Sequence, residues 1–180
     1  GDYLSERYQM VKQAFLSHPN VLKATAYRYY LPGSGGVLRE VSTESGDVYR
    51  MLAQEVDEDF FETFGIELIA GRAFQQNEMI VPNSAILNET AARLLGWEDP
   101  IGKQVLFGPR RRPVTVVGIV KDFHSQPLRT KIKPLVIVNK SILFKALALK
   151  IDGQNMPETL AFLEQTWNQF LPDRPFQFWF

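Results

Sequence analysis

The sequence predicts an α+β fold in which both chain ends build one lobe and the middle of the chain builds a small inserted α/β lobe. Helical and strand patterns interleave along the 180 residues without the long βαβαβα series of a doubly wound sheet. The two ends resemble each other, since each combines a helix with a neighbouring strand. We therefore expect a single module of residues 1–180, with lobe A over 1–74 and 143–180 and lobe B over 75–142. One continuous sheet through all strands would contradict this division.

Two long helices are predicted from apolar residues that recur every three or four positions. The first covers about residues 3–17 and ends before Pro19, and the second covers about 156–170, where Pro157 suits the first turn. The apolar faces are Leu4, Tyr8, Val11 and Phe15 in the first helix, and Leu160, Leu163, Trp167 and Phe170 in the second.

Two short helices are predicted from the residues at their ends. Asp57 is expected to cap a helix that carries three phenylalanines and ends at Gly65. Asn88 is expected to cap a second helix that ends at Gly96. The carboxylates of residues 57–59 suit the positive end of a helix dipole, which is a sufficient reason for their presence.

Strands are predicted where β-branched and aromatic residues cluster between turn residues. A Pro- and Gly-rich loop is expected over 31–36, and a closing aromatic strand over 176–180 would complete a β–α–β unit with the last helix. The other predicted strands are 21–30, 48–56, 66–70, 85–87, 104–107, 113–120, 135–138 and 145–151.

Composition excludes several classes of protein. Lys plus Arg and Asp plus Glu are 20 each, so the chain lacks the basic excess of a nucleic-acid binder. It has no Cys, which excludes disulfides and thiolate metal sites. No run approaches the roughly 18–20 apolar residues that cross a bilayer. Gly1 and the aromatic run ending at Phe180 favour a domain excised from a longer chain, since a bare aromatic edge strand invites aggregation.

No catalytic, cofactor-binding or metal-binding set is predicted. The two histidines, His18 and His124, lie in no metal-ligand spacing, and no Gly-x-Ser-x-Gly elbow is present. Residues 96–103 depart from a phosphate-binding loop in both glycine spacing and the final Ser/Thr. Asp122 and His124 alternate to one side of an extended segment. They form either a His–carboxylate pair for acid–base work or, as we favour, a structural pair that holds the following loop.

Two basic segments are the candidates for partner or anion contact. One is Arg110, Arg111 and Arg112, which the pattern places in a solvated turn between two strands. The other is Arg129, Lys131 and Lys133, near Lys121. If both segments share a face, they suit an anionic headgroup or an acidic partner.

Three segments together resemble the periplasmic core domain of MacB/FtsX-like permeases of ABC transporters. They are VDEDFFETFG at 56–65 running into LIAGRAF at 68–74, ILNETAARLLG at 86–96 followed by DPIGK at 99–103, and VVGIVKDFH at 116–124. Their order and spacing agree with the family over about residues 50–140. The matched positions that we expect to specify the scaffold are Gly65, Gly71, Arg72, Asn88, Gly102, Gly118, Asp122 and His124.

The resemblance implies a domain on the periplasmic side of the inner membrane, with a porter-like lobe and a small inserted lobe. It implies a role in transport by mechanotransmission: a separate cytoplasmic ATPase subunit drives a dimeric permease, and the domain passes the motion to cargo or to a partner outside. The partners implied are the transmembrane helices of its own permease, the ATPase, and a periplasmic adaptor or second permease copy. The full gene is then expected to encode an apolar helix before Asp2 and another after Phe180.

Two other functions remain open at this point. A stand-alone periplasmic ligand-binding or sensor domain would use the basic segments and exposed aromatic residues to hold a ligand. An enzyme is the third hypothesis, which a turnover lost on mutation of Asp122 or His124 would support.

Overall fold

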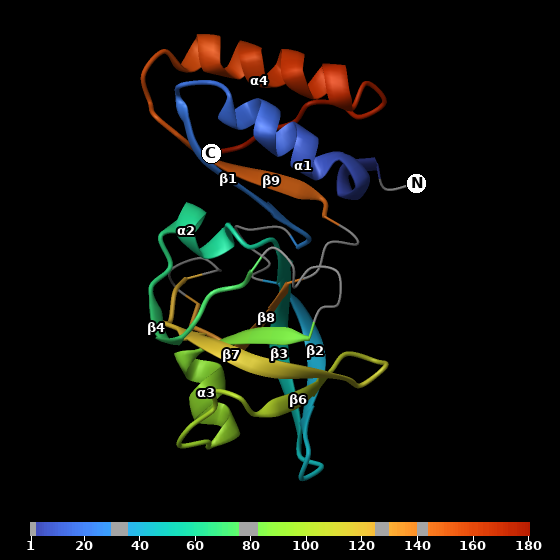
Figure 1. The fold of residues 1–180 in the computed structure, drawn as a ribbon, viewed down its shortest axis with the longest axis vertical. Coiled ribbons are helices and arrows are strands. Elements are labelled where there is room, and N and C mark those ends of the chain that lie inside the picture. Colours follow the sequence, from blue (N-terminus) through green and yellow to red (C-terminus); the bar gives the residue numbers. More distant parts are fainter. Residues whose placement is uncertain (1–2, 30–35, 76–82, 125–129, 140–143) are drawn as a thin grey trace.

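The computed structural model describes residues 3–29, 36–75, 83–124, 130–139 and 144–180. Figure 1 shows helices and strands in two parts, one above the other. The helices are α1 (Tyr3–Leu16), α2 (Phe60–Phe64), α3 (Glu89–Leu95) and α4 (Met156–Phe170). The strands are β1 (Val21–Tyr27), β2 (Val37–Thr43), β3 (Val48–Val56), β4 (Leu68–Gly71), β5 (Ser84–Asn88), β6 (Gln104–Phe107), β7 (Arg112–Val120), β8 (Leu135–Asn139) and β9 (Ala146–Ile151).

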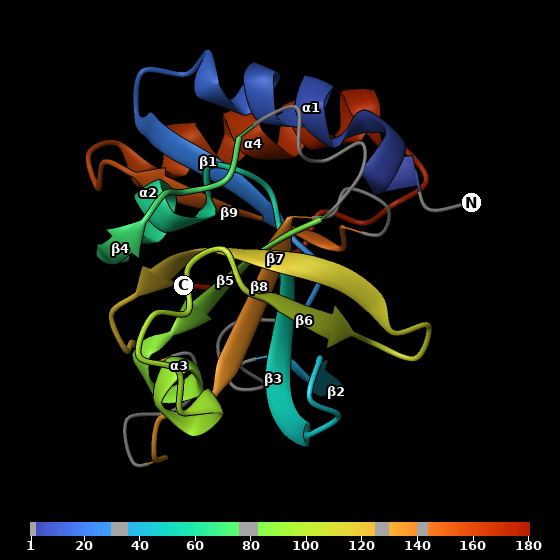
Figure 2. The ribbon, with the colours of Figure 1, turned by 60° about the horizontal axis from the view of Figure 1, so that its bottom comes forward.

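The described strands form one mixed sheet in the order β2-β6-β7-β5-β8-β3-β1-β9, with β4 paired to β7. β2 also pairs antiparallel with β3, so β2, β6, β7, β5, β8 and β3 form a closed ring of strands. The sheet is narrow at one place, because β1 and β3 pair there at the single position Tyr27–Val56. On one side of this junction lie β1 and β9 with α1 and α4, which we call the terminal layer; on the other side lie the remaining strands with α3 (Figures 1 and 2). The α+β class is confirmed.

Strand pairing differs from the predicted lobe boundaries. β2 and β3 fall within predicted lobe A, but β2 pairs with β6 and β3 pairs with β8, both from predicted lobe B. The described strands also form one continuous sheet. The predicted division rested on the likeness of the two chain ends, and that likeness carries no information about which distant strands β2 and β3 join.

Three apolar clusters fill the molecule. The first lies between α1, α4 and one face of β1 and β9, and includes Phe15, Phe144 and Leu163. The second joins α2 to the middle of the sheet, and the third lies under α3. Leu147 and Leu149 face the first cluster, whereas Ala146 and Ala148 face the α2 cluster, as the two-residue repeat of a strand requires. β1 and β9 are therefore covered on both faces.

Most helices and their ends are as predicted, one strand was missed, and two local predictions were wrong. Residues 37–43 form β2, which the Gly-rich run beside it hid. Residues 176–180 form no strand. Asp57 does not cap α2: the N-cap is Asp59, without a side-chain hydrogen bond, and Asp57 has buried partners instead. Most of the predicted loop at 31–36 lies outside the described residues.

Candidate functional site: an apolar groove and a buried junction

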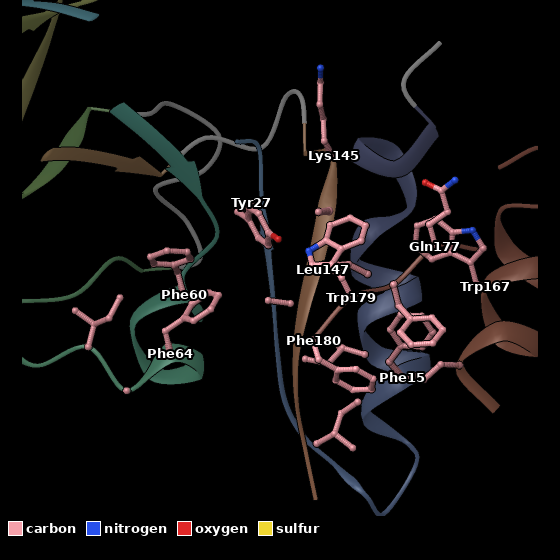
Figure 3. A pocket seen from close by; sticks show the side chains of 18 of the residues that line it. Phe15, Tyr27, Phe60, Phe64, Lys145, Leu147, Trp167, Gln177, Trp179 and Phe180 are labelled. Carbon is pink, nitrogen blue, oxygen red and sulfur yellow. The ribbon is translucent and has the colours of Figure 1, made fainter. Parts of the chain in front are cut away.

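A groove of about 890 Å³ follows the edge of β9 that faces away from β1. Five consecutive residues, 145–149, line it, so the backbone edge of β9 borders the groove and not only one face. Residues 174–180, which follow α4, line it as well. Figure 3 shows Leu147, Trp167 and Trp179 around this space, from β9, α4 and the segment after α4 respectively.

Apolar side chains form both walls of the groove. Phe15 of α1 and Trp167 of α4 line it from one side, and Phe60 and Phe64 of α2 line it from the other. The indole Nε1 of Trp167 donates to the carbonyl of Arg174 at 2.9 Å and so holds the start of the last segment. From there, rings contact each other at every second residue, with centroids 5.7 Å apart for the tilted pair Phe176–Phe178 and 5.6 Å for the edge-to-face pair Phe178–Phe180. This alternation is that of an extended chain.

Polar groups lie at the rim of the groove. Lys121 and Glu67 form an exposed ion pair with Nζ and Oε2 3.0 Å apart, and His124 is exposed. Among the described residues, no group of three His, Cys, Asp or Glu side chains could hold a metal ion. The chemistry of the groove is thus that of an apolar surface with two backbone edges.

The junction between β1 and β3 contains a buried ion pair. Lys12 of α1 and Asp57, just after β3, are 2% and 0% exposed, and Nζ lies 2.6 Å from Oδ2. Asp57 also accepts hydrogen bonds from the Thr25 hydroxyl and from the Ala26 amide, both in β1. Lys12 makes a second ion pair with Asp59. One carboxylate therefore joins α1, β1 and the end of β3.

Burial disfavours the charged forms of Lys12 and Asp57, whereas the contact between them favours those forms. Burial alone would lower the pKa of Lys12, but the carboxylates of Asp57 and Asp59 together outweigh burial and raise that pKa. Burial raises the pKa of Asp57, against the lowering by Lys12, Thr25 and the Ala26 amide. A buried carboxylate of this kind depends on each of its partners, because any group removed leaves charge without compensation.

A second ion pair lies beside the first. Arg28 Nη1 is 2.8 Å from Glu55 Oε1, and the Arg28 amide donates to the Glu55 carbonyl at 2.9 Å. The Asp57 amide donates to the Ala26 carbonyl at 3.0 Å. These contacts extend the single strand pair Tyr27–Val56 on both sides, so the narrow part of the sheet is held by side chains as much as by backbone pairing.

The motif residues around α3 form a hydrogen-bonded scaffold. Asn88 caps α3 as predicted: its Oδ1 accepts from the amides of Ala91 and Leu135, each at 2.9 Å, and its Nδ2 donates to the Lys133 carbonyl. Asp122 accepts from the Thr90 amide at 2.9 Å and from its hydroxyl at 2.7 Å.

Both carboxylate oxygens of Asp122 are engaged with α3. Besides Thr90, Arg93 donates to Oδ2 at 2.7 Å. Burial opposes ionisation of Asp122, but these hydrogen bonds outweigh it and hold the pKa of the carboxyl below its usual value. His124 is exposed two residues further on. The Asp122 carboxylate thus holds the first turns of α3, and the contacts of the described residues include no pairing between Asp122 and His124.

The motif glycines have two different roles. Gly65 and Gly96 end α2 and α3 in the left-handed conformation, as predicted, and Gly102 has φ +83°. Gly71 and Gly118 are needed where β4 pairs with β7: a Cβ on Gly71 would lie 2.2 Å from the Val117 carbonyl oxygen. A Cβ on Gly118 would lie 2.5 Å from the carbonyl oxygen of Arg72, whose amide pairs with Val117. Close backbone approach therefore requires glycine at both positions.

The structure does not bring the two basic segments together. Arg110 and Arg111 lie in the turn before β7, and Arg112 is the first residue of β7. All three are exposed. Lys131 and Lys133 are also exposed and come just before β8. The first residue of β8, Leu135, donates its amide to Asn88, and Asn88 pairs with Val120 at the end of β7. Nine residues of β7 separate these ends, about 27 Å at the usual strand rise. Arg129 lies outside the described residues.

Lys12 and Thr25 were missed by the sequence analysis, although Lys12 left a signal. It sits four residues after Tyr8 and three before Phe15, on the apolar face of α1. A cation on that face needs a buried partner. The sequence could not say that the partner is Asp57, because the helix-capping explanation for that carboxylate was locally sufficient.

Residues 3–162 match the family model for the MacB-like periplasmic core domain. Macrolide export ATP-binding/permease proteins MacB of Neisseria gonorrhoeae and of Neisseria meningitidis serogroup B are 31% identical over 94 residues, which is 51% of this chain and 14% of theirs. MacB 2 of Aeromonas hydrophila is 35% identical over 71 residues, 37% of this chain and 10% of that protein. The chain thus spans a small part of the curated relatives it matches.

Solved structures with the same fold come from similar proteins. The periplasmic region of MacB from Actinobacillus actinomycetemcomitans gives a TM-score of 0.67 at 16% identity, over 89% of this chain and 72% of that one. The extracellular domain of the ABC-type transporter YknZ from Gram-positive bacteria gives 0.66 at 12% identity, over 89% and 82%. A domain of a permease protein from Porphyromonas gingivalis gives 0.62 at 20% identity, over 88% and 75%. In the described part of the chain, no helix has the length and apolar character to cross a membrane.

Proposed function

Because the chain belongs to the family of MacB-like periplasmic core domains, we propose that it is the extracytoplasmic part of an ABC transporter permease and transmits motion across its own fold. A cytoplasmic ATPase supplies the motion, the permease's transmembrane helices carry it, and cargo or a partner outside the membrane receives it. An adaptor protein or a second permease copy is the partner we propose. The domain itself supplies no catalytic group, cofactor or metal in this function.

The buried junction is the observation that supports transmission. A domain that passes on movement must not bend where its two parts meet, and here only one pair of strand residues spans the narrow point. Lys12, Asp57 and Thr25 connect α1 and β1 to the end of β3, a strand inside the large sheet, with all three side chains buried. Displacement of α1 is therefore passed directly to that sheet.

Spin-label distances in the intact transporter test this function. The chain contains no Cys, so a cysteine placed at Met10 on α1 and one at Val48 on β3, both more than half exposed, can be labelled specifically. In the full permease with its ATPase in nanodiscs, we expect the Met10–Met10 distance between permease copies to change on ATP binding, while Met10–Val48 within one domain stays constant. If the Met10–Met10 distance between copies does not change on ATP binding, the proposed function is contradicted. If the Met10–Val48 distance within one domain changes, rigid transmission is contradicted.

A ligand-binding or sensor domain is the second candidate, and the groove is the observation that favours it. Its volume of about 890 Å³ is within the range of small-molecule sites, roughly 300–1,000 Å³. Thermal-shift measurements against lipids, peptides and glycans distinguish the two. Tight binding that is lost in Phe64→Ser, at the groove, and kept in Val48→Ser, away from it, would favour the sensor function. Phe64 and Val48 are both well exposed, so neither change should unfold the chain.

A further inference from the structure

β9 ends the sheet with an open backbone edge. It pairs with β1 on one side, and among the described strands none pairs with its other side. An open apolar strand edge normally carries charges, a bulge or a cover that prevents association with other chains. Here the edge is apolar over Ala146–Leu149 and borders the groove, and the segment 174–180 borders the groove from elsewhere. The groove therefore lies between two extended stretches of backbone.

The directions of β1, β9 and the segment after α4 indicate that the groove has room for one more strand. β1 and β9 are antiparallel. In both ribbon views, α4 crosses back over β9 and the segment after it then runs in the same direction as β9 (Figures 1 and 2). Two parallel strands joined by a helix form a β–α–β unit, and in the split form of this unit another strand lies between the two.

The start of α1 fits the same arrangement. α1 begins at the end of the terminal layer where β9 begins, and it runs back over the layer to reach the first residue of β1 (Figures 1 and 2). A strand in the groove that is antiparallel to β9 would be parallel to β1 and would finish where α1 begins. α1 would then be the helix of a second β–α–β unit, interleaved with the first.

The walls of the groove define the character of such a strand. Helices α1 and α4 lie on one face of β1 and β9, and α2 lies on the other, so a strand beside β9 would be buried on both faces. Strands buried on both faces are nearly continuous apolar runs, without the polar alternation of a half-exposed strand. The exposed aromatic residues Phe178, Trp179 and Phe180 gather at the same place, as expected where core is missing a neighbour.

We propose that the groove receives one apolar β-strand from the polypeptide that leads into α1, antiparallel to β9 and to residues 175–180. It would complete a four-stranded antiparallel β-sheet of β1, β9, the added strand and residues 175–180, under α1 and α4. The matched segment is 14% of the length of the curated Neisseria relatives, so most of their polypeptide lies outside it. This inference holds whether the domain transmits motion or binds a ligand.

Hydrogen exchange in a lengthened chain tests the strand. The gene's preceding fifteen or so codons are added to residues 1–180, and amide exchange is compared with that of the shorter chain. The edge amides of β9 and the amides of 176–180 should exchange more slowly, on the order of 100-fold, because they gain ladder hydrogen bonds. Amides of β2, which pairs with β3 and β6 outside the terminal layer, serve as the control and should not change. Equal exchange of the β9 amides in the two chains would overturn the proposal.

Disulfide trapping tests the register and the source. Ala148→Cys in β9 is combined with single cysteines along the added residues, in a chain otherwise free of Cys. Cross-strand neighbours bring Cβ atoms to within about 5.5 Å, so trapping should peak at one position and recur only at its strand neighbours. Leu38→Cys, at an exposed position of β2, is the matched control and should trap none.

The other occupants give different results. Uniform or absent trapping with Ala148→Cys, together with binding of a fatty acid or detergent to the lengthened chain, would show that the groove stays open for a ligand and would refute the strand. New pairing of β9 with residues 176–180 in the lengthened chain would refute it too, since the groove would then close without an added strand.

Discussion

Replacing Lys12 by Met should destabilise the fold strongly, because it removes the cation from a fully buried carboxylate. Asp57 would keep the Thr25 hydroxyl and the Ala26 amide but lose its only charged partner within hydrogen-bonding distance in the described structure. Breaking a buried pair by removing one member typically costs about 3–5 kcal/mol. Met fills a volume close to that of the Lys side chain, so the loss reports charge more than packing.

The pH sets an upper limit on the unfolding free energy that Lys12→Met loses. With Lys12 gone, Asp57 can avoid its buried charge by taking up a proton, at about 1.4 kcal/mol per pH unit above its unfolded pKa of about 3.9, or roughly 4 kcal/mol at pH 7 and 1.5 kcal/mol at pH 5. Because the folded variant then binds more protons than the unfolded chain, its stability falls as pH rises through this window. The penalty of Lys12→Met should therefore shrink steadily from pH 7 to pH 5.

Urea unfolding followed by tryptophan fluorescence at pH 7, 6 and 5 measures the effect. The matched control is Lys23→Met: Lys23 pairs with Glu62 at the same 2.6 Å as Lys12 with Asp57, but on the surface. Exposed pairs contribute little, so this control should shift the midpoint only slightly at every pH. The double variant Lys12→Met, Asp57→Asn should recover part of the loss, because no buried charge remains.

Two results would refute the reasoning. One is a loss in Lys12→Met no larger than in Lys23→Met, which would mean that burial adds nothing to the pair. The other is a loss that does not change between pH 5 and pH 7, which would mean that the uncompensated carboxylate is not its cause. If Lys12→Met does not fold at pH 7, its recovery at pH 5 and the double variant still decide the question.

Three further changes test the scaffold. Asn88→Ala should cost about 3 kcal/mol in urea unfolding, more than an ordinary cap, because the buried Leu135 amide loses its acceptor together with the first turn of α3. Asp122 has a lowered pKa, so its contribution to stability is present above about pH 3.9 and is lost as pH falls through the folded value; Asp122→Asn should flatten that part of the acid-unfolding curve. Gly71→Ala should lower the thermal midpoint far more than Gly46→Ala: both have positive φ, worth about 1–2 kcal/mol, but only at Gly71 would the Cβ collide with backbone. Equal effects at the two glycines would contradict the close approach of β4 and β7.

Local chemistry was enough to predict much of the fold. The apolar faces of α1 and α4, the Asn88 cap and the stops at Gly65 and Gly96 depend on residues within one or two turns of each other. The same holds for most strands, whose β-branched runs are bounded by turn residues. The family motifs are made of these local signals, which is why they could identify the family without revealing a site.

Long-range pairing decided the rest. The sequence alone determined the helices, their ends, most of the strands and the family. Only the tertiary structure decided that Asp57 meets Lys12 45 positions away, that Arg110 and Lys131 lie near opposite ends of β7, and that β9 keeps an open edge beside residues 176–180. An aromatic run makes a strand only when a neighbouring backbone is available to pair with it. Segments distant in sequence supply that neighbour, and no local pattern records them.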